Sequence, residues 1–454
     1  MEFSKMKNII LVGLCLISIS VCSQQTLTLD QAIAIGLDRS IVAKIASRQI
    51  TIAENNNIKA NTGTSPSLTI DASIPFSFNR TFGDRFFAFG VVPGDSRVNY
   101  SESERLSING QWPLYTGGRG GLLREQLDLA VDQTNITLDG EQQRTVLDII
   151  QSYYTAVLQS ERLEVLREVI QLSKDRIEFE EIKKEFGTSN SFNILQLEDA
   201  LLNDSTEMVN QYTQIDLAMR SLLDNMNEDI DITRYVVTDN LEFIPEVLDK
   251  ETLISEMLAN NNEISALELN KKFAEVNTKI QSSQRKPFVS ANGSFGFNRN
   301  ASGFLGVNPR TNEKDPIAPT RGYGLNLGIT ASYNLFDGGL IKNNIANAKL
   351  EQEIADLTFE DVKQDFEVQL LNLIDNYSNN INLLAITEEK LKLANQNITI
   401  AEERFKSGAI NSFDYRNIQL TLLNTSFTRL SILYDLVITK SNIDWLTGKY
   451  NIID

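Results

Sequence analysis

Histidine is absent from this chain of 454 residues. Because histidine is the commonest metal ligand and the usual general base near neutral pH, its absence excludes histidine-dependent hydrolases and most zinc enzymes. The only two cysteines, Cys15 and Cys22, lie close to the N-terminus. Without that segment the chain can form no disulfide and offers no thiol nucleophile. The sequence therefore predicts no catalytic site, no metal site and no cofactor.

Long apolar runs are also scarce. One such run, over residues 9–19, follows two lysines and is too short for an ordinary transmembrane helix. Small residues come next, so residues 1–23 have the features of a secretory signal peptide, with cleavage expected after Ser23. The alternative is a lipoprotein signal in which Cys22 becomes the acylated N-terminus. Val21, directly before Cys22, is bulkier than that processing usually accepts.

Basic residues are fewer than acidic ones: the chain has 42 Lys and Arg and 60 Asp and Glu, which gives a net charge of -18. Proteins that bind nucleic acid neutralise phosphates with basic patches. The composition thus argues against nucleic acid as a partner and indicates an exported, acidic protein.

The chain contains a tandem duplication. The segment around Gly187 recurs around Gly408, 221 positions later. The same offset relates further landmarks, namely Asn190 and Asn411, Ser191 and Ser412, Phe192 and Phe413, Gly117-Gly118 and Gly338-Gly339, Trp112 and Tyr333, Pro66 and Pro287, and Leu37 and Leu258. A period this long is typical of two equivalent halves and not of a solenoid.

Each half contains two segments with strict period-two alternation. Residues 68–78 alternate apolar and mostly polar side chains, as do residues 106–114, 289–298 and 323–335. Each half therefore contributes one strand hairpin, with strands of on the order of ten residues, about the length that crosses a bilayer at a tilt. Apolar-out and polar-in alternation is typical of an outer-membrane barrel. A soluble sheet with one buried face would show the same pattern.

Proline-free segments decide between these alternatives. Residues 118–186 have no proline and, past the initial glycines, only Gly140, while residues 340–406 have neither proline nor glycine. At about 1.5 Å per residue, each segment can form a helix of roughly 100 Å, which is typical of coiled coils or extended bundles. A helix with Asp30 as N-cap is also expected before the first strands.

Each long helix is expected to end at a glycine, Gly187 or Gly408. Asn190 and Asn411 would then cap the next helix, which makes each turn a tight helical hairpin. The predicted organisation is a first repeat over 24–226 (hairpin 67–115, helix 118–186, tip 187–191, helix 191–226), an irregular linker over 227–248, and a second repeat over 249–454 (hairpin 288–336, helix 338–407, tip 408–412, helix 412–446).

These features together resemble the TolC-type outer-membrane efflux proteins. The resemblance covers essentially the whole mature sequence and includes an aromatic–x–Leu–aromatic–x–Gly–Gly junction in each half, at residues 112–118 and 333–339. It implies an α+β membrane protein that forms a homotrimer. Four strands per chain would give one 12-stranded barrel in outer-membrane lipid, continued by a helical periplasmic barrel. The number of strands agrees with a trimer, because the four strands of one chain would leave open sheet edges in lipid.

The resemblance also implies a function. The protein would be the passive exit duct of a tripartite efflux or type I secretion system in a Gram-negative bacterium. Its helical tips would dock a periplasmic adaptor that brings an inner-membrane pump of RND, ABC or MFS type. The residues expected to contact the adaptor are Phe186, Gly187, Thr188, Ser407, Gly408 and Ala409.

The family closes its tunnel at these tips with a polar and acidic constriction. Matched by position, the constriction falls on Asp414 and Asn193, and three copies of Asp414 would form a carboxylate ring that favours cations. Alternatively, Asp414 only interacts with the dipole of the helix that Asn411 caps. Ile410 stands where the family is often basic, so instead of a salt-bridge latch we expect a hydrogen-bonded gate that involves Asn411 and Tyr415.

Aromatic residues lie at the strand ends that precede the long helices. Trp112, Tyr115, Tyr333 and Phe336 are expected to form an interfacial girdle, although packing at the transition from strands to helices would also explain them. Two other functions remain open. A structural or adhesive coiled-coil protein would not need duplicated hairpins with capped tips. An exported hydrolase with paired carboxylates would need a pocket-like setting, which the sequence does not show.

Overall fold

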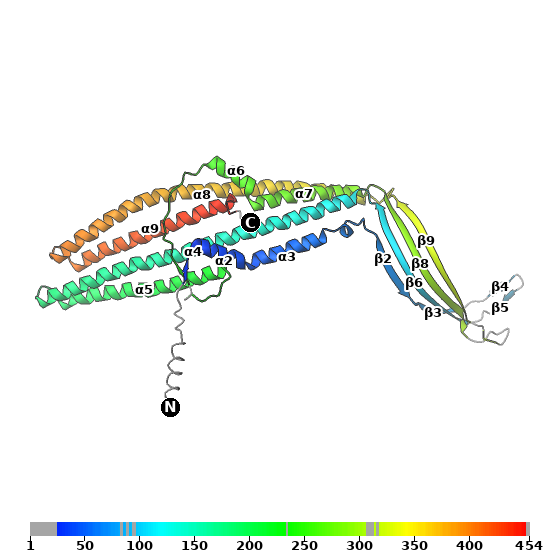
Figure 1. Ribbon diagram of the computed structural model, residues 1–454, viewed down its shortest axis with the longest axis horizontal. Coiled ribbons are helices and arrows are strands. Elements are labelled where there is room, and N and C mark those ends of the chain that lie inside the picture. Colours follow the sequence, from blue (N-terminus) through cyan, green and yellow to red (C-terminus); the bar gives the residue numbers. More distant parts are fainter. Residues whose placement is uncertain are drawn as a thin grey trace, which may run out of the picture. The chain divides into compact units, whose positions relative to one another are not determined.

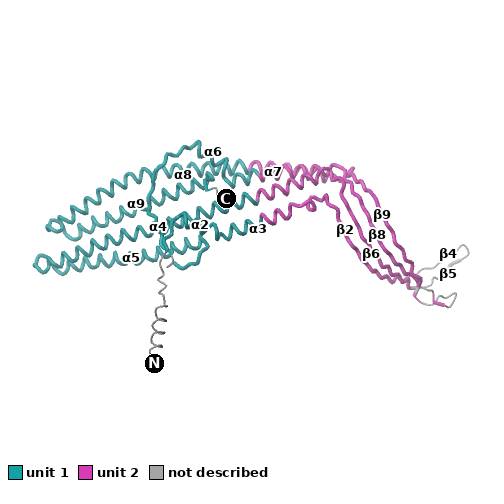
Figure 2. Tube along the Cα trace, viewed as in Figure 1, with its two compact units in different colours: residues 1–49, 134–268, 358–454 teal, residues 50–133, 269–357 magenta. Residues whose placement is uncertain are grey.

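The computed structural model describes residues 25–81, 85–87, 90–92, 97–232, 235–305, 313–314 and 317–450. The predicted signal peptide and Cys22 lie outside the described residues. The chain divides into two compact units, coloured in Figure 2: residues 1–49, 134–268 and 358–454, and residues 50–133 and 269–357. They are called unit 1 and unit 2 below.

The duplication is visible in the lengths of the helices (Figure 1). The two longest, α4 and α8, both have 67 residues, and α5 and α9, which follow them, both have 35. Shorter helix pairs precede the strands of each half. The bounds are α2 Leu29–Arg39, α3 Ile41–Asn56, α4 Arg119–Glu185 and α5 Ser191–Asn225 in the first half, and α6 Lys250–Asn260, α7 Asn262–Ser283, α8 Leu340–Lys406 and α9 Ser412–Leu446 in the second.

The helix before the first strands does not begin as predicted. Asp30 was expected to be the N-cap, but α2 is capped by Thr28, whose side chain accepts a hydrogen bond from the backbone of Gln31. The Gln31 side chain in turn accepts from the backbone N–H of Thr28. This capping box satisfies two backbone donors, whereas Asp30 lies in the first turn, where its charge complements the helix dipole.

Unit 1 is built around the central parts of the long helices. Its main core includes Tyr153 and Leu222 from the first half and Leu370 and Leu436 from the second, all nearly inaccessible to solvent. The linker between the halves, expected to be irregular, contains the short strand β7 (Tyr235–Val237). It pairs in parallel with β1 (Gln25–Leu27). The linker is therefore anchored to the start of the chain.

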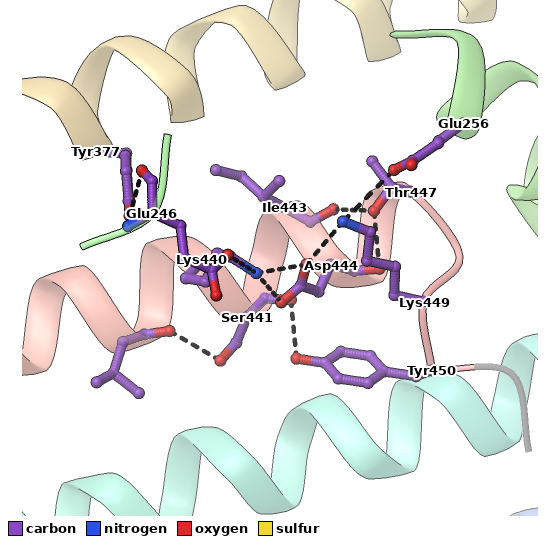
Figure 3. Close-up of polar contacts among 11 residues, drawn as sticks. Glu246, Glu256, Tyr377, Lys440, Ser441, Ile443, Asp444, Thr447, Lys449 and Tyr450 are labelled. Atoms are coloured by element: carbon purple, nitrogen blue, oxygen red, sulfur yellow. Dashed lines mark hydrogen bonds and ion pairs between the residues drawn. The ribbon is translucent and has the colours of Figure 1, made fainter. Parts of the chain in front are cut away.

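A polar cluster attaches the rest of the linker to the second half (Figure 3). Lys440 on α9 forms ion pairs with Asp444, at 2.7 Å, and with Glu246 of the linker, at 3.5 Å. The backbone N–H of Glu246 donates to the Tyr377 hydroxyl of α8 over 2.9 Å. Nearby, Lys449 pairs with Glu256 of α6. These contacts join the linker, α6, α8 and α9 within unit 1.

Unit 2 contains an antiparallel sheet in the order β2-β6-β8-β9, with β3 also paired to β6. The bounds are β2 Ser67–Ser73, β3 Phe76–Thr81, β6 Arg97–Tyr115, β8 Phe288–Leu305 and β9 Ala318–Ser332; a separate small sheet pairs β4 Arg85–Phe87 with β5 Gly90–Val92. The predicted single strand over 68–78 is interrupted at residues 74–75, where Pro75 has no N–H to donate. The pairing register with β6 continues unchanged across the break, so β2 and β3 occupy one strand position of four.

The strands are longer than the ten residues expected. β6 has 19 residues and β8 has 18. Their alternation continues past the apolar segment that revealed them in the sequence. Below, the end of each strand next to a helix is called the helix end, and the opposite end the loop end.

Candidate functional site

The tips of the two helical hairpins are the first candidate site. Both tips lie at the same end of unit 1 (Figures 1 and 2). Each long helix ends in a glycine with positive φ, 69° at Gly187 and 78° at Gly408. The backbone N–H of Thr188 donates to the carbonyl of Lys183 over 2.9 Å, and that of Ala409 to Arg404 over 2.8 Å. These are Schellman caps, which satisfy the last carbonyls of each helix.

The next helix starts within four residues of each glycine. The Asn190 side chain accepts from the backbone N–H of Asn193 over 3.0 Å, and Asn411 accepts from Asp414 over 2.9 Å. Both asparagines have extended backbone angles, as N-caps require. The turn predicted from the glycine and asparagine signals is therefore present in both halves.

A small aromatic core packs the two hairpins together at the tips. Phe405 on α8 lies between Phe179 on α4 and Tyr415 on α9, with ring centroids 5.8 and 5.5 Å away. The Lys183 ammonium lies 4.9 Å from the Phe179 ring and 4.7 Å from the Phe405 ring, and it donates to the Phe405 carbonyl over 3.2 Å. Cation–π contacts of this kind stabilise partly desolvated sites.

Beside this core lies a buried polar network that the sequence did not predict. Arg416 on α9 forms a two-point ion pair with Asp204 on α5, at 2.5 and 2.7 Å. Gln419, one turn further and fully buried, donates to the Val169 carbonyl at 2.8 Å and to the Ser173 hydroxyl at 2.9 Å, both on α4. The network thus connects three helices and both hairpins.

Arg176 on α4 carries the second buried positive charge of this region. Its guanidinium lies 5.2 Å from the centre of the Tyr415 ring, and its Nη1 donates to Gln419 at 3.4 Å. Its Nε and Nη2 have no hydrogen-bond partner within the described part of the chain. Burial, together with the positive charge of Arg416, lowers the pKa of Arg176 to about 10. A cavity of about 290 Å³ borders Arg176, Phe179, Phe405 and Tyr415.

The structure separates the residues predicted for the gate. Asp414 is exposed in the first turn of α9, and Asn411 acts as its cap. Asn193 is partly exposed and donates weakly, over 3.4 Å, to Glu180. Tyr415 is only 3% exposed and packs in the aromatic core. Asp414 and Asn411 are therefore placed to face solvent or a lumen, while the position of Tyr415 is that of a packing residue.

The residues predicted to contact an adaptor lie on the surface of both tips. Phe186 is 79% exposed, a high value for a large apolar side chain. The other residues of this set, Gly187, Thr188, Ser407, Gly408 and Ala409, are also exposed. Behind them, a groove of about 450 Å³ separates the first turns of α5 and α9 and includes the exposed Phe192, Leu195 and Phe413.

The sheet of unit 2 is the second candidate site, because its two faces differ completely. One face, called the outward face below, is apolar and exposed in the single chain. It carries Leu68, Ile70, Leu106, Ile108, Phe295, Tyr323, Leu325, Leu327 and Ile329. The opposite face carries hydroxyl and amide groups that hydrogen-bond across strands, for example Asn109 to Asp71 at 2.6 Å and Asn292 to Thr330 at 3.0 Å. The alternation predicted from the sequence is thus present.

The four residues predicted to form an aromatic girdle lie at the helix ends of the strands. Trp112 and Tyr115 on β6 are about half exposed, as is Tyr333 just after β9. Phe336 is 87% exposed. No described helix is long and apolar enough to cross a membrane. Within the described ranges, no group of three or more Asp, Glu, His or Cys side chains could hold a metal ion.

Comparisons with known proteins identify this architecture. Residues 253–449 match the family model of outer membrane efflux proteins. Among solved structures, the outer membrane protein VceC from Vibrio cholerae matches with a TM-score of 0.72 and 14% identity, over 92% of this chain and 96% of that one. CusC matches with a TM-score of 0.73 and 14% identity, over 92% of both chains. No sequence relative was found among curated proteins.

A third match is the CmeC outer membrane channel of Campylobacter jejuni, with a TM-score of 0.71 and 15% identity, over 92% of this chain and 85% of that one. The fold is therefore that of an outer-membrane channel with strands for a shared barrel and long helices for a tunnel. The predicted resemblance and fold class are confirmed: residues 253–449 match the outer membrane efflux protein family, and the chain shares the fold of these channels.

Proposed function

We propose that three copies of this chain form the exit duct of a tripartite efflux or secretion system in the outer membrane of a Gram-negative bacterium. The observation that carries the proposal is the two-faced sheet of four strand positions. Its apolar outward face suits lipid, its polar face suits a water-filled lumen, and its order leaves β2 and β9 as edges. Unpaired strand edges are not tolerated in lipid, so closure requires further copies, and three copies give twelve strands.

The duct performs no chemistry. Its energy and most of its selectivity come from a pump in the inner membrane, which is of RND, ABC or MFS type. A periplasmic adaptor connects this pump to the hairpin tips. Support comes from the exposed Phe186 and from the groove lined by Phe192, Leu195 and Phe413, since exposed apolar side chains of this size mark interaction surfaces.

At the tips, three copies of Asp414 form the narrowest ring of the lumen, and Asn193 and Asn411 supplement it with hydrogen bonds. Asp414 is the group best placed for this role because it is exposed and its helix cap fixes its backbone. Tyr415 contributes indirectly, by packing α9 against α8 through Phe405.

A site-specific crosslink tests the adaptor contact. Ser407→Cys places one thiol at the tip of α8, since the mature chain is expected to lack free cysteine. A photo-reactive group attached to it in cells should capture a periplasmic adaptor protein, and the adaptor identifies its pump. The matched control is Thr278→Cys on α7, far along the chain from either tip. Labelling of Ser407→Cys by a membrane-impermeant reagent added outside intact cells would place the tip on the wrong side of the membrane and refute the proposal.

A further inference from the structure

One charged row interrupts the apolar outward face of the sheet. The register pairs Glu104 on β6 with Arg299 on β8, and Arg299 with Arg321 on β9. The row next to it, toward the helix ends, contains Leu106, Phe297 and Tyr323 on the same three strands. Side chains two residues apart on a strand share a face, so these charges belong to the apolar face and not to the polar one.

The charged row is organised by short contacts. Arg299 Nη1 lies 2.5 Å from Glu104 Oε1 and 3.6 Å from Glu102 Oε1. The Tyr100 hydroxyl donates to Glu102 Oε2 over 2.6 Å. Arg321 is exposed, and the described residues provide its side chain with no ion pair or hydrogen bond. One arginine is therefore fixed by two carboxylates, and its neighbour Arg321 has no ion-pair partner among the described residues.

The depth of this row follows from strand geometry. Trp112 lies eight positions after Glu104 on β6, toward the helix end. At about 3.3 Å per residue and a tilt of roughly 40°, the row lies about 20 Å from Trp112 along the membrane normal. The apolar band of outer-membrane barrels is about 25 Å tall. With Trp112 at the near edge of that band, the charges lie about 5 Å short of its far edge, next to the headgroups of the outer leaflet.

Aromatic side chains resume on the loop-end side of the charged row. Phe78 and Tyr100 pack with ring centroids 5.3 Å apart, and Phe76 lies opposite Glu102 in the register. Aromatic rings of this kind favour the membrane interface. The charged row is thus enclosed between an apolar band and an aromatic pair, which is a setting for a lipid headgroup and not for bulk water.

We propose that Arg299 and Arg321 bind the phosphate of an outer-leaflet lipid, whose acyl chains lie on the apolar rows around Phe297 and Tyr323. Two guanidinium groups on adjacent strands can donate several charge-assisted hydrogen bonds to one phosphate. Glu102 and Glu104 hold Arg299 in position. A lipid is the occupant that fits, because the site is continuous with the lipid-facing band. The inference rests on the proposed function, which takes this face to be the one in the membrane.

Binding of purified lipids tests the site. The full-length protein in mild detergent is titrated with lipid A that carries both phosphates and with its dephosphorylated form, and bound lipid is counted by native mass spectrometry. Arg321→Gln removes the positive charge that has no ion-pair partner among the described residues, so no described ion pair is broken. The matched control is Arg105→Gln, the same change on the polar face of the same sheet. Arg299→Gln is a second variant, used if it still forms the native oligomer.

Arg321→Gln should weaken binding of the phosphorylated lipid by roughly fivefold, the effect of one arginine near an anionic headgroup. Arg105→Gln should bind as the unaltered protein does, and the dephosphorylated lipid should bind both variants equally. Equal binding of the phosphorylated lipid by Arg321→Gln and by the unaltered protein would overturn the lipid-site inference but not the proposed function. An equal loss of binding in Arg105→Gln would do the same. If neither lipid bound any form of the protein, the assignment of this face to the membrane would fail as well.

Discussion

At the scale of single residues, the Arg416–Asp204 pair is a buried ion pair that joins the two hairpins near their tips. Both side chains are largely buried, and they connect α9 to α5. Removing one partner of a buried pair leaves an uncompensated charge, which typically costs 3–5 kcal/mol. An exposed pair contributes about 0–1 kcal/mol, because solvent screens it and both side chains lose entropy.

We therefore expect Arg416→Met to lower the free energy of unfolding by about 3 kcal/mol or more. Lys406→Met is the control, since it breaks the exposed i,i+4 pair with Glu402 and should change stability by less than about 1 kcal/mol. Denaturant unfolding of the detergent-solubilised protein, followed by far-ultraviolet circular dichroism, measures both. Equal losses in the two variants would show that the buried network does not stabilise the tip.

At the scale of elements, each hairpin turn depends on one glycine. Gly408 has a φ of 78°, and a Cβ added there would meet no atom within 4 Å. The cost of Gly408→Ala is therefore backbone strain alone, about 1–2 kcal/mol for a left-handed conformation. Gly140→Ala, in the interior of α4, should instead stabilise the protein by about 0.5–1 kcal/mol, because alanine restricts the unfolded chain. The midpoint temperature of thermal unfolding should fall in Gly408→Ala and rise in Gly140→Ala. A shift of both midpoints in the same direction would contradict this explanation.

The sequence was sufficient to predict these elements because their signals are local. Glycine followed by asparagine marked both hairpin turns, and α8 and α9 begin and end within about two residues of the predicted bounds. Strict alternation revealed which side chains share a face of the sheet. Strand length was underestimated because the alternation was recognised only where one face was apolar. It continues through charged residues such as Glu104 and Arg299.

The buried polar network was not predicted, because it depends on contacts between segments far apart in the chain. Gln419 donates to residues about 250 positions earlier. A signal was nevertheless present. Gln419 lies four residues after Tyr415 and four before Leu423, on a helix stripe that is otherwise apolar and buried. Asp204 similarly lies seven residues after the buried Leu197. Polar residues at such positions indicate buried hydrogen bonds.

At the scale of the whole molecule, the trimer should select cations at its tip. Each carboxylate about 8 Å from a permeating ion contributes roughly 0.5 kcal/mol in water, attractive for a cation and repulsive for an anion. Three copies of Asp414 would therefore change the ratio of cation to anion permeability by roughly a hundredfold at low salt. Asp414→Asn should remove most of this preference, measured as a reversal potential across a planar bilayer under a salt gradient. Glu403→Gln, an exposed carboxylate near the end of α8, should leave the preference intact. A loss of cation preference in Glu403→Gln but not in Asp414→Asn would show that Asp414 does not set the selectivity of the channel.

The account depends most on closure of the barrel by three copies of the chain. The sheet order leaves β2 and β9 as edges, so in the trimer β9 of one copy must pair with β2 of the next. A cysteine at Thr69 on β2 can be combined with cysteines scanned along the same face of β9, at Asn326, Gly328 and Thr330. Paired edges bring two such residues within disulfide distance, which requires Cα atoms less than about 7 Å apart. We predict that at least one combination yields covalent dimers and trimers on oxidation. If every combination left only monomers on a denaturing gel, the shared barrel would be contradicted.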